Sequence, residues 1–557
     1  MPLRIPTIAS LILGIAVSAF GQSGQFSLAS SLHAAAEAAA QQPSETVRRL
    51  SMDEAVKLAL EQNLNIRIQR FDPQIQDVGI AQAKAFWAPS LSTNVSRSSQ
   101  TQQPTSSLAG GATNILNSNI NSSIGLAQTL PWGAQYSATW NSSRFTTTNQ
   151  FQSFSPQIGS NLNLQFSQPL LRNLDIDQIR MQVADSKKAR ELSDIQLLTV
   201  ITQTVRSVRN AYWDLSYAIN NLKAQQESLA LAQQSLRDNQ KRVEIGTMAP
   251  IDIVQAQAEV ASNEERAIVA EATIKAAQDN LRALILDPGA ADFWSVVFEP
   301  TDAPAFTAQA IDVDAAVRAA LEKRSDLQAA KNSLEQSEIN IRYYSNQIKP
   351  DVNANVSYIT TAAGGTQLSP VDFAAISRGD QITRSIVSQR SFGTVLGDVF
   401  QNAYPNWTVG VTIGYPLGAS VSHANLARVK LQYEQAQTQL TNLKLQVATQ
   451  VRSIARNVQT NQQRVQSAKA SRELQEKKLE AEEKKMAAGM GQTFFVFQAQ
   501  RDLSLARTAE IQAIADYNKS LVDFEAVQLV PVGGAAGSIT TAGAGTLQVG
   551  GIVVTGR

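Results

Sequence analysis

The sequence has 557 residues and contains no cysteine, two histidines and almost no net charge. Without cysteine the chain has no disulfide, no thiolate for catalysis or metal binding, and no acceptor for an N-terminal lipid. Lysine and arginine number 48 and aspartate and glutamate 47, so the formal charge is +1. A chain this close to neutral lacks the field that recruits nucleic acid, and we expect no nucleic-acid partner.

Long hydrophobic runs are also scarce. One apolar run extends from Ile8 to Phe20, after Arg4 and before the small residue Gly21. This pattern is typical of a secretory signal peptide, so we expect residues 1–21 to be removed and the mature protein to be exported. No later run reaches the roughly 18 apolar residues of a membrane-spanning helix. Any membrane attachment is therefore expected to come from the folded protein.

Sequence patterns of known catalytic sites are missing as well. The chain has no P-loop, nucleophile elbow or zinc-binding HExxH motif. His33 and His423 are far apart in the sequence and neither has a plausible set of partners. We expect no enzymatic activity, no cofactor and no bound metal.

The chain repeats itself. Residues 51–96 align without a gap on residues 312–357, and residues 246–260 align on residues 489–503. Such self-similarity indicates a tandem duplication. The expected organisation is a signal peptide at 1–21, an N-terminal linker at 22–50, a first repeat at 51–286, an inter-repeat linker at 287–310, a second repeat at 311–528 and a flexible tail at 529–557.

Each repeat contains one very long helical hairpin. Residues 178–245 contain no proline and no glycine. Their apolar residues recur every seven positions, which predicts a coiled-coil seam: Ile201, Val208, Leu215, Leu222, Leu229, Leu236 and Val243. A helix of this length spans about 100 Å. Its partner is expected at 251–286, with residues 55–87 stacked end to end on it, and the second hairpin at 425–488 and 495–528.

The segments between the helices alternate apolar and polar residues. Between residues 88 and 171 only Arg97 and Arg144 are charged. The alternation predicts strands at 89–100, 158–168, 351–361 and 406–416, and one apolar face opposite an uncharged polar face suits a membrane-spanning barrel. A soluble sandwich would alternate in the same way. Four strands are too few to close a barrel, so several copies would have to share one. A further hairpin at 120–130 and 134–141 would either extend the barrel or lie outside it.

In order and spacing these segments resemble the TolC-type outer membrane efflux proteins over residues 51–528. The resemblance depends on short phrases at the junctions: Leu50-Ser51-Met52-Asp53-Glu54, Ala88-Pro89-Ser90, Gln168-Pro169-Leu170, Tyr415-Pro416-Leu417, Glu244-Ile245-Gly246-Thr247 and Ala488-Gly489-Met490. The expected fold is therefore an α+β membrane protein, a tandem-repeat protomer with coiled-coil helices that form a periplasmic α-barrel and four or more strands that enter a trimeric β-barrel.

The family resemblance also implies a function and partners. It implies a homotrimer in the outer membrane of a Gram-negative bacterium, with a 12-stranded barrel in lipid and the helices in the periplasm. The channel would passively conduct substrates that an inner-membrane transporter delivers through a periplasmic adaptor, in efflux or type I secretion. The adaptor would contact the hairpin tips, formed by Gly246, Thr247, Met248, Gly489, Met490 and Gly491. A soluble periplasmic coiled-coil adaptor or scaffold is the alternative.

The resemblance suggests an aperture beside the tips. Some family members narrow the channel with acidic residues on the second return helix, where this chain has Phe495 and Gln498. We expect closure by Phe494, Phe495 and Phe497 instead. In the first repeat Asp252 occupies the corresponding place; it either lines the mouth or acts as a helix N-terminal acid favoured by the helix dipole.

Overall fold

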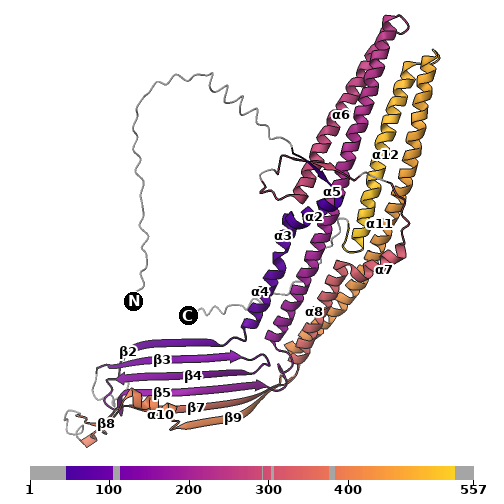
Figure 1. Ribbon diagram of the computed structural model, residues 1–557. Coiled ribbons are helices and arrows are strands. Elements are labelled where there is room, and N and C mark those ends of the chain that lie inside the picture. Colours follow the sequence, from indigo (N-terminus) through magenta and orange to yellow (C-terminus); the bar gives the residue numbers. More distant parts are fainter. Residues whose placement is uncertain are drawn as a thin grey trace, which may run out of the picture.

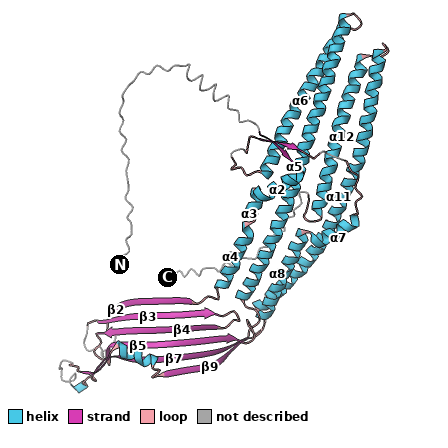
Figure 2. Cartoon of the chain, in the orientation of Figure 1, coloured by secondary structure: helices cyan, strands magenta, loops and turns pink. Residues whose placement is uncertain are grey.

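The computed structural model describes residues 46–104, 113–290, 293–302, 306–374, 383–417 and 420–532. The expected signal peptide and most of the expected N-terminal linker and C-terminal tail lie outside these residues. The described part is a broad sheet joined to one end of a long helical arm (Figures 1 and 2). Within these ranges, no helix is both long enough and apolar enough to span a bilayer.

Two long helical hairpins form the arm. Helices α5 (Gln178–Glu244) and α11 (Val421–Ala487) have 67 residues each and correspond residue by residue at an offset of 243. Their return helices are α6 (Pro250–Ile285) and α12 (Thr493–Val527). At 1.5 Å per residue α5 and α11 each span about 100 Å. The predicted helical hairpins are thus confirmed.

The predicted seam lies at the helix contacts. Val208 and Leu215 of α5 are fully buried, and so are their counterparts Val451 and Val458 of α11. Alanines pack between these larger side chains, at 211, 218 and 232 of α5. Small side chains at alternate layers let neighbouring helices approach closely, which is why the arm needs little aromatic core.

Shorter helices continue the return helices toward the sheet. These are α2 (Met52–Gln62), α3 (Leu64–Gln69) and α4 (Phe71–Ala85) in the first repeat, and α7 (Val313–Lys323) and α8 (Ser325–Gln347) in the second. A capping box between Ser51 and Glu54 starts α2. The Asn63 side chain donates to the Leu284 carbonyl, 2.9 Å away, where α6 ends and α3 begins. The predicted end-to-end stacking is therefore confirmed.

The connection between the repeats is held at mid-arm. Strand β1 (Thr46–Leu50) pairs in parallel with β6 (Val296–Pro300) beside α2 and α5, so part of the expected N-terminal linker is a strand. The Tyr212 hydroxyl lies 2.8 Å from the Asp302 carboxylate and 3.1 Å from the Leu50 carbonyl. The Tyr517 hydroxyl donates to the Thr307 carbonyl at 2.8 Å. One tyrosine from each repeat therefore anchors this connection.

The first residues of the expected tail are also packed. Val530 and Val532 are buried in a cluster with Leu327, Val447 and Val451 of the second repeat. The ordered chain thus extends to the last described residue, four positions beyond the expected end of the repeat.

The sheet contains more strands than the four predicted ones. The long strands are β2 (Ser90–Gln102), β3 (Ile115–Thr129), β4 (Gln135–Thr147), β5 (Phe154–Pro169), β7 (Asp351–Leu368) and β9 (Pro405–Gly414). Within the described chain they are neighbours in the order β2-β3-β4-β5-β7-β9, all antiparallel. The predicted strands correspond to β2, β5, β7 and β9. The further hairpin is β3–β4, and it lies inside the sheet.

Two short elements complete the distal end of the sheet. Strand β8 (Ile386–Arg390) pairs with the end of β7 that β9 does not reach. Helix α10 (Phe392–Phe400) packs on β5 and β7, with Val395 and Val399 buried against Ala362. Neither element was predicted.

Candidate channel wall and helical tips

The sheet has one apolar face that crosses all six long strands. An unbroken row of paired residues shows it: Leu91, Leu126, Ala138, Leu164, Tyr358 and Trp407. Apolar side chains on this face remain open to the surroundings, including Val409, Val411 and Ile413, which are 59 to 70% exposed. Helix α10 covers this face only over part of β5 and β7, where Val395 and Val399 pack on Ala362. A soluble domain rarely leaves the rest of such a face uncovered, so that part requires an apolar environment.

The opposite face of the long strands is polar and lacks charge. One row consists of Asn94, Ser123, Asn141, Asn161 and Thr361. The Asn141 amide donates to the Asn161 side chain at 3.0 Å. Among the described residues of these strands, the only charged side chain with this parity is Asp351, at the end nearest the helices. This face suits water and imposes little electrostatic selection.

Two arginines lie on the apolar face, away from the helical arm. Arg97 of β2 and Arg144 of β4 pair with the same residue of β3, Ile120, from its two sides. They therefore belong to one row of the sheet. Their position near the distal ends of the strands is where a lipid-facing arginine reaches the membrane surface.

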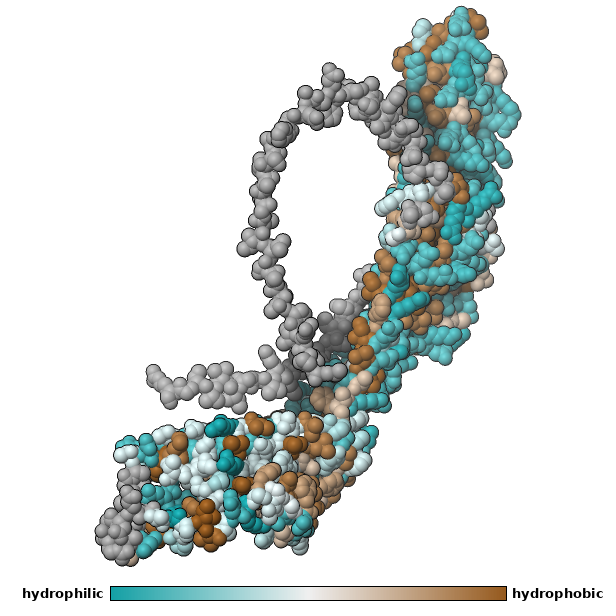
Figure 3. All heavy atoms as spheres, turned by 60° about the vertical axis from the view of Figure 1, so that its left-hand side comes forward, coloured by the Kyte–Doolittle hydropathy of each residue, from teal (hydrophilic) through white to brown (hydrophobic). Residues whose placement is uncertain are grey.

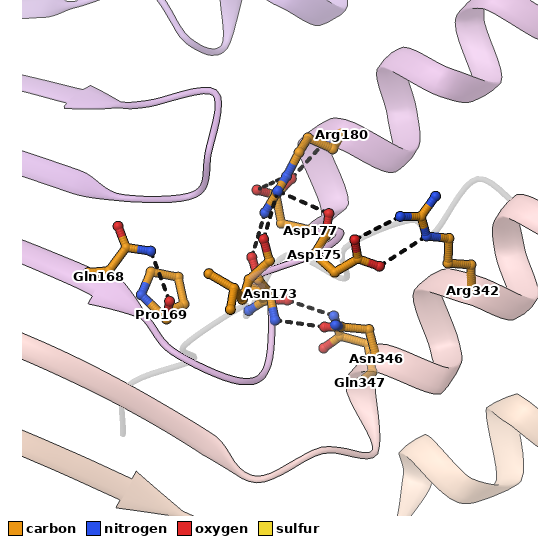
Figure 4. Close-up of polar contacts among 10 residues, drawn as sticks. Gln168, Pro169, Asn173, Asp175, Asp177, Arg180, Arg342, Asn346 and Gln347 are labelled. Atoms are coloured by element: carbon orange, nitrogen blue, oxygen red, sulfur yellow. Dashed lines mark hydrogen bonds and ion pairs between the residues drawn. The ribbon is translucent and has the colours of Figure 1, made fainter.

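A polar network fixes the sheet to the arm (Figure 4). Asn173, in the left-handed conformation with φ 63°, follows β5; its backbone N–H donates to the Asn346 side chain at 2.7 Å. Arg342 of α8 donates two hydrogen bonds, of 3.0 and 2.7 Å, to Asp175 before α5. These hydrogen bonds lower the pKa of Asp175 below its usual value. The network thereby ties the segment that follows β5 in the first repeat to the end of α8, which leads into β7 of the second repeat.

The first predicted tip ends α5 with a left-handed glycine. Gly246 has φ 76° and donates to the Val243 carbonyl at 3.0 Å. The next N–H, of Thr247, donates to the Arg242 carbonyl at 2.8 Å. This is a Schellman-type helix end, and α6 then starts at Pro250, a favoured first helical residue.

The second predicted tip ends α11 in the same way. Gly489 has φ 74°, its N–H donates to the Met486 carbonyl, and the Met490 N–H donates to the Lys485 carbonyl at 2.9 Å. Met490 is 79% exposed. Gly491 lies so close to the helix end that an added Cβ would sit 2.8 Å from the Met486 nitrogen. Both tips lie at the end of the arm farthest from the sheet (Figure 1).

The aperture candidates divide by burial. Phe494 and Phe495 are 54% and 47% exposed, and their rings meet edge to face with centroids 5.7 Å apart. Gln498 is exposed, whereas Phe497 is buried within the hairpin. Asp252 is half-buried in the first turn of α6 and has no ion pair within the described chain. The open surface beside the tips thus contains Phe494, Phe495 and Gln498.

Polar contacts hold the two hairpins side by side along the arm. Ser228 and Ser504 hydroxyls lie 3.1 Å apart, and the Gln500 amide donates to the Ser235 hydroxyl at 3.0 Å. Arg507 bridges Glu227 of the first hairpin and Glu476 of the second. The two hairpins are therefore joined along the arm, at positions 11 to 19 residues from the tip glycines Gly246 and Gly489.

The junction network and the mid-arm tyrosines were not predicted from the sequence. Asn173, Arg342 and Tyr212 act through partners at least 90 positions away. A single sequence has no signal for such pairs. The β3–β4 hairpin was predicted, since Ile120, Ile124 and Leu126 alternate with polar residues, but its place inside the sheet was left open.

The model of one protein family, outer membrane efflux protein, matches residues 55–285 and 316–527. The chain belongs to this family. The matched ranges contain the long hairpins and all six long strands of the efflux protein described here. No curated protein sequence matches the chain.

Solved structures share the fold at low sequence identity. The Campylobacter jejuni CmeC outer membrane channel aligns with a TM-score of 0.57 and 14% identity, over 86% of this chain and 85% of its own. The Vibrio cholerae outer membrane protein VceC aligns with 0.57 and 15%, over 86% and 96%. The open state of the Neisseria gonorrhoeae MtrE outer membrane channel aligns with 0.56 and 17%, over 86% and 89%.

Proposed function

We propose that three copies of this efflux protein form a passive channel through the outer membrane of a Gram-negative bacterium. The sheets close into a barrel whose apolar face contacts lipid and whose polar face lines the pore. The helical arms extend the pore through the periplasm, where an adaptor connects it to an inner-membrane transporter. The chain itself catalyses no reaction.

One observation carries this proposal. A single sheet has an exposed apolar face and an uncharged polar face, and it runs directly into helices about 100 Å long. Lipid accepts a strand only when every backbone group is paired, and a closed barrel provides this. A soluble coiled-coil adaptor would share the helices but has no need for the apolar face.

The edges of the chain support a head-to-tail ring. One free sheet edge is β2, which follows α4; the other is β9, which precedes α11, with the short strand β8 beyond it (Figure 1). Two different edges that meet make a heterologous contact, which closes into a ring when the rotation between successive copies completes a full turn. Such a ring leaves no strand edge open.

The helical edges are complementary as well. Apolar side chains on α3 and α4 that are at least 60% exposed recur at helical spacing, at Ile68, Phe71, Ile75 and Val78. Figure 3 shows hydrophobic areas, in brown, along the face of the arm that it draws. Helix α11 has exposed cations without ion pairs in the described chain, namely Arg428, Lys430, Lys444, Arg456 and Lys469. Helix α6 has exposed acids that are likewise without ion pairs in the described chain, namely Glu264, Glu265 and Glu271.

Conductance of the purified protein in planar bilayers, combined with its mass in detergent, tests the channel. The proposal expects discrete conductance steps from a particle of three chains. A water-soluble monomer or dimer without conductance would instead favour the soluble scaffold. A trimer without conductance would indicate a channel closed at the helical tips by Phe494 and Phe495.

Cross-linking at the tips tests the adaptor contact. Met490→Cys, the only cysteine in the variant, is expected to form adducts with a periplasmic adaptor protein in intact cells. Leu474→Cys, which is also well exposed but lies on the shaft of α11, is the matched control. Equal adducts from both positions would contradict an adaptor contact at the tips.

A further inference from the structure

The β3–β4 hairpin is a full part of the sheet and not an appendage. β3 pairs with β2 over thirteen residue pairs and β4 pairs with β5 over eleven, without a register shift. Deleting the hairpin would leave β2 and β5 adjacent and still antiparallel, because β2 runs away from the arm and β5 returns to it. The chain therefore has two more long strands than a continuous antiparallel sheet of β2, β5, β7 and β9 would contain.

The hairpin also continues both faces of the sheet. Ile124 and Trp140 add to the apolar face, between Thr93 and Leu162 in one row. On the polar face, Asn141 of the hairpin is hydrogen-bonded to Asn161 of β5. A hairpin that projected into the pore or into water would not need apolar side chains at alternate positions that continue the apolar face of the sheet.

The width of the sheet follows from these pairings. β8 pairs with residues 365–368 of β7 and β9 with residues 351–360, so both lie along the same edge of β7, one beyond the other. The described part of one protomer is therefore six strands wide.

We propose that three protomers close a barrel of 18 strands, six from each chain. This inference depends on the channel function proposed above. With strands about 4.8 Å apart and tilted by about 40°, such a barrel is about 36 Å across, against about 24 Å for 12 strands. Within the described residues each chain has two long helical hairpins, so the enlargement is confined to the membrane section.

The wall chemistry defines what this wide section passes. Asparagine, serine, threonine and glutamine line it, and within the six long strands the only charged side chain on this face is Asp351, at the inner end. A wide, hydrated and uncharged wall neither binds nor repels ions strongly. The membrane section therefore admits bulky polar or amphipathic solutes of either charge, and selection is left to the helical tips and the transporter.

Cysteine pairs test whether the hairpin stays in the wall of the assembled channel, and the native chain contains no cysteine to interfere. Asn94, Ser123, Asn141 and Asn161 occupy one row of the polar face on β2, β3, β4 and β5. Disulfides should form in the pair Asn94→Cys with Ser123→Cys and in the pair Asn141→Cys with Asn161→Cys. The pair Asn94→Cys with Asn161→Cys should stay reduced, because two strands separate these positions. A disulfide between residues 94 and 161 would overturn the proposal.

Polymer exclusion in planar bilayers measures the width independently. Uncharged polymers added on the barrel side should enter the full-length channel up to a radius of about 12 Å, and a variant without β3 and β4 only up to about 6 Å. A cut-off near 6 Å for the full-length channel would reject the wide barrel while leaving the channel function intact. Absence of any conductance would reject the channel function itself. If the shortened variant does not assemble, the cysteine pairs still decide the question.

Discussion

Helices α5 and α11 match residue by residue at an offset of 243, whereas the strand regions of the two repeats differ. The first repeat contains four long strands; the second has β7 and β9, with β8 and α10 between them. The helices pack against one another through a repeated seam, so an insertion there would disturb every layer. A hairpin inserted between β2 and β5 widens the sheet and leaves the pairing of β5 with β7 and of β7 with β9 intact. The comparison thus indicates a conserved helical frame and a strand region free to change width.

The sharpest test of this comparison puts charge on the inserted and the shared strands. Ile124→Arg on β3 and Val411→Arg on β9 both place a cation on the apolar face, and each should lower the free energy of unfolding by about 2–4 kcal/mol in lipid vesicles. The measurement is denaturant unfolding of the vesicle-inserted protein. The matched controls, Ser123→Arg and Thr412→Arg, point to the polar face and should change stability little. A much smaller cost at Ile124 than at Val411 would mean that the hairpin does not face lipid.

The two tyrosines of the mid-arm connection should differ in importance. Tyr212→Phe removes hydrogen bonds to the Asp302 carboxylate and its N–H, and should cost about 2 kcal/mol. Tyr517→Phe removes hydrogen bonds to the neutral Thr307 carbonyl and the Gln309 N–H, and should cost about 1 kcal/mol. Thermal or denaturant unfolding of each variant measures the difference. The reverse order would show that the second repeat, and not the first, anchors the connection.

The two tips should respond differently to the same side chain. The first repeat has Met248 where the second has Gly491. Gly491→Met brings a side chain against the backbone of Met486, so hydrogen exchange of the turn at 486–493 should rise by about tenfold, which corresponds to about 1.4 kcal/mol. Met248→Gly is the matched exchange at the first tip and should have a smaller effect. Equal protection in Gly491→Met and the native chain would contradict the close contact.

The smallest expected difference concerns position 185. Asp185 of α5 corresponds to the exposed Arg428 of α11, and burial raises its pKa to about 6 from 3.8. Because the folded protein disfavours the ionised carboxyl, the stabilising effect of the protonated form is complete below pH 3.8 and is lost as the pH rises through 6. Asp185→Asn should therefore stabilise the protein at pH 7.5 by about 1 kcal/mol and do little at pH 4. Denaturant unfolding at both pH values checks this; an equal effect at both would rule out the titration.

The helical frame and the four shared strands were predictable because their patterns are local. A seven-residue repeat without proline or glycine specifies α5, and strict alternation specifies β5 and β9. Gly246 and Gly489 were predictable for the same reason, since a left-handed helix end favours glycine within a few residues.

The remaining features depend on partners distant in the sequence. Gly393 and Gly397 weaken the helical tendency of α10, which is stabilised by packing of Val395 and Val399 on Ala362 of the sheet. The place of the β3–β4 hairpin is set by pairing with β2 and β5, which alternation alone does not specify. Likewise, the burial of Phe497 and the exposure of Phe494 and Phe495 depend on how the hairpins pack.

Electron cryo-microscopy of the purified protein in lipid nanodiscs tests the central claim most directly. We expect a ring of three chains in which β2 of each chain is hydrogen-bonded to β9 of the next, with one lumen continuous from the sheet to the tips at Gly246 and Gly489. A particle whose β2 and β9 edges remain unpaired, or whose sheet encloses no lumen, would contradict the channel.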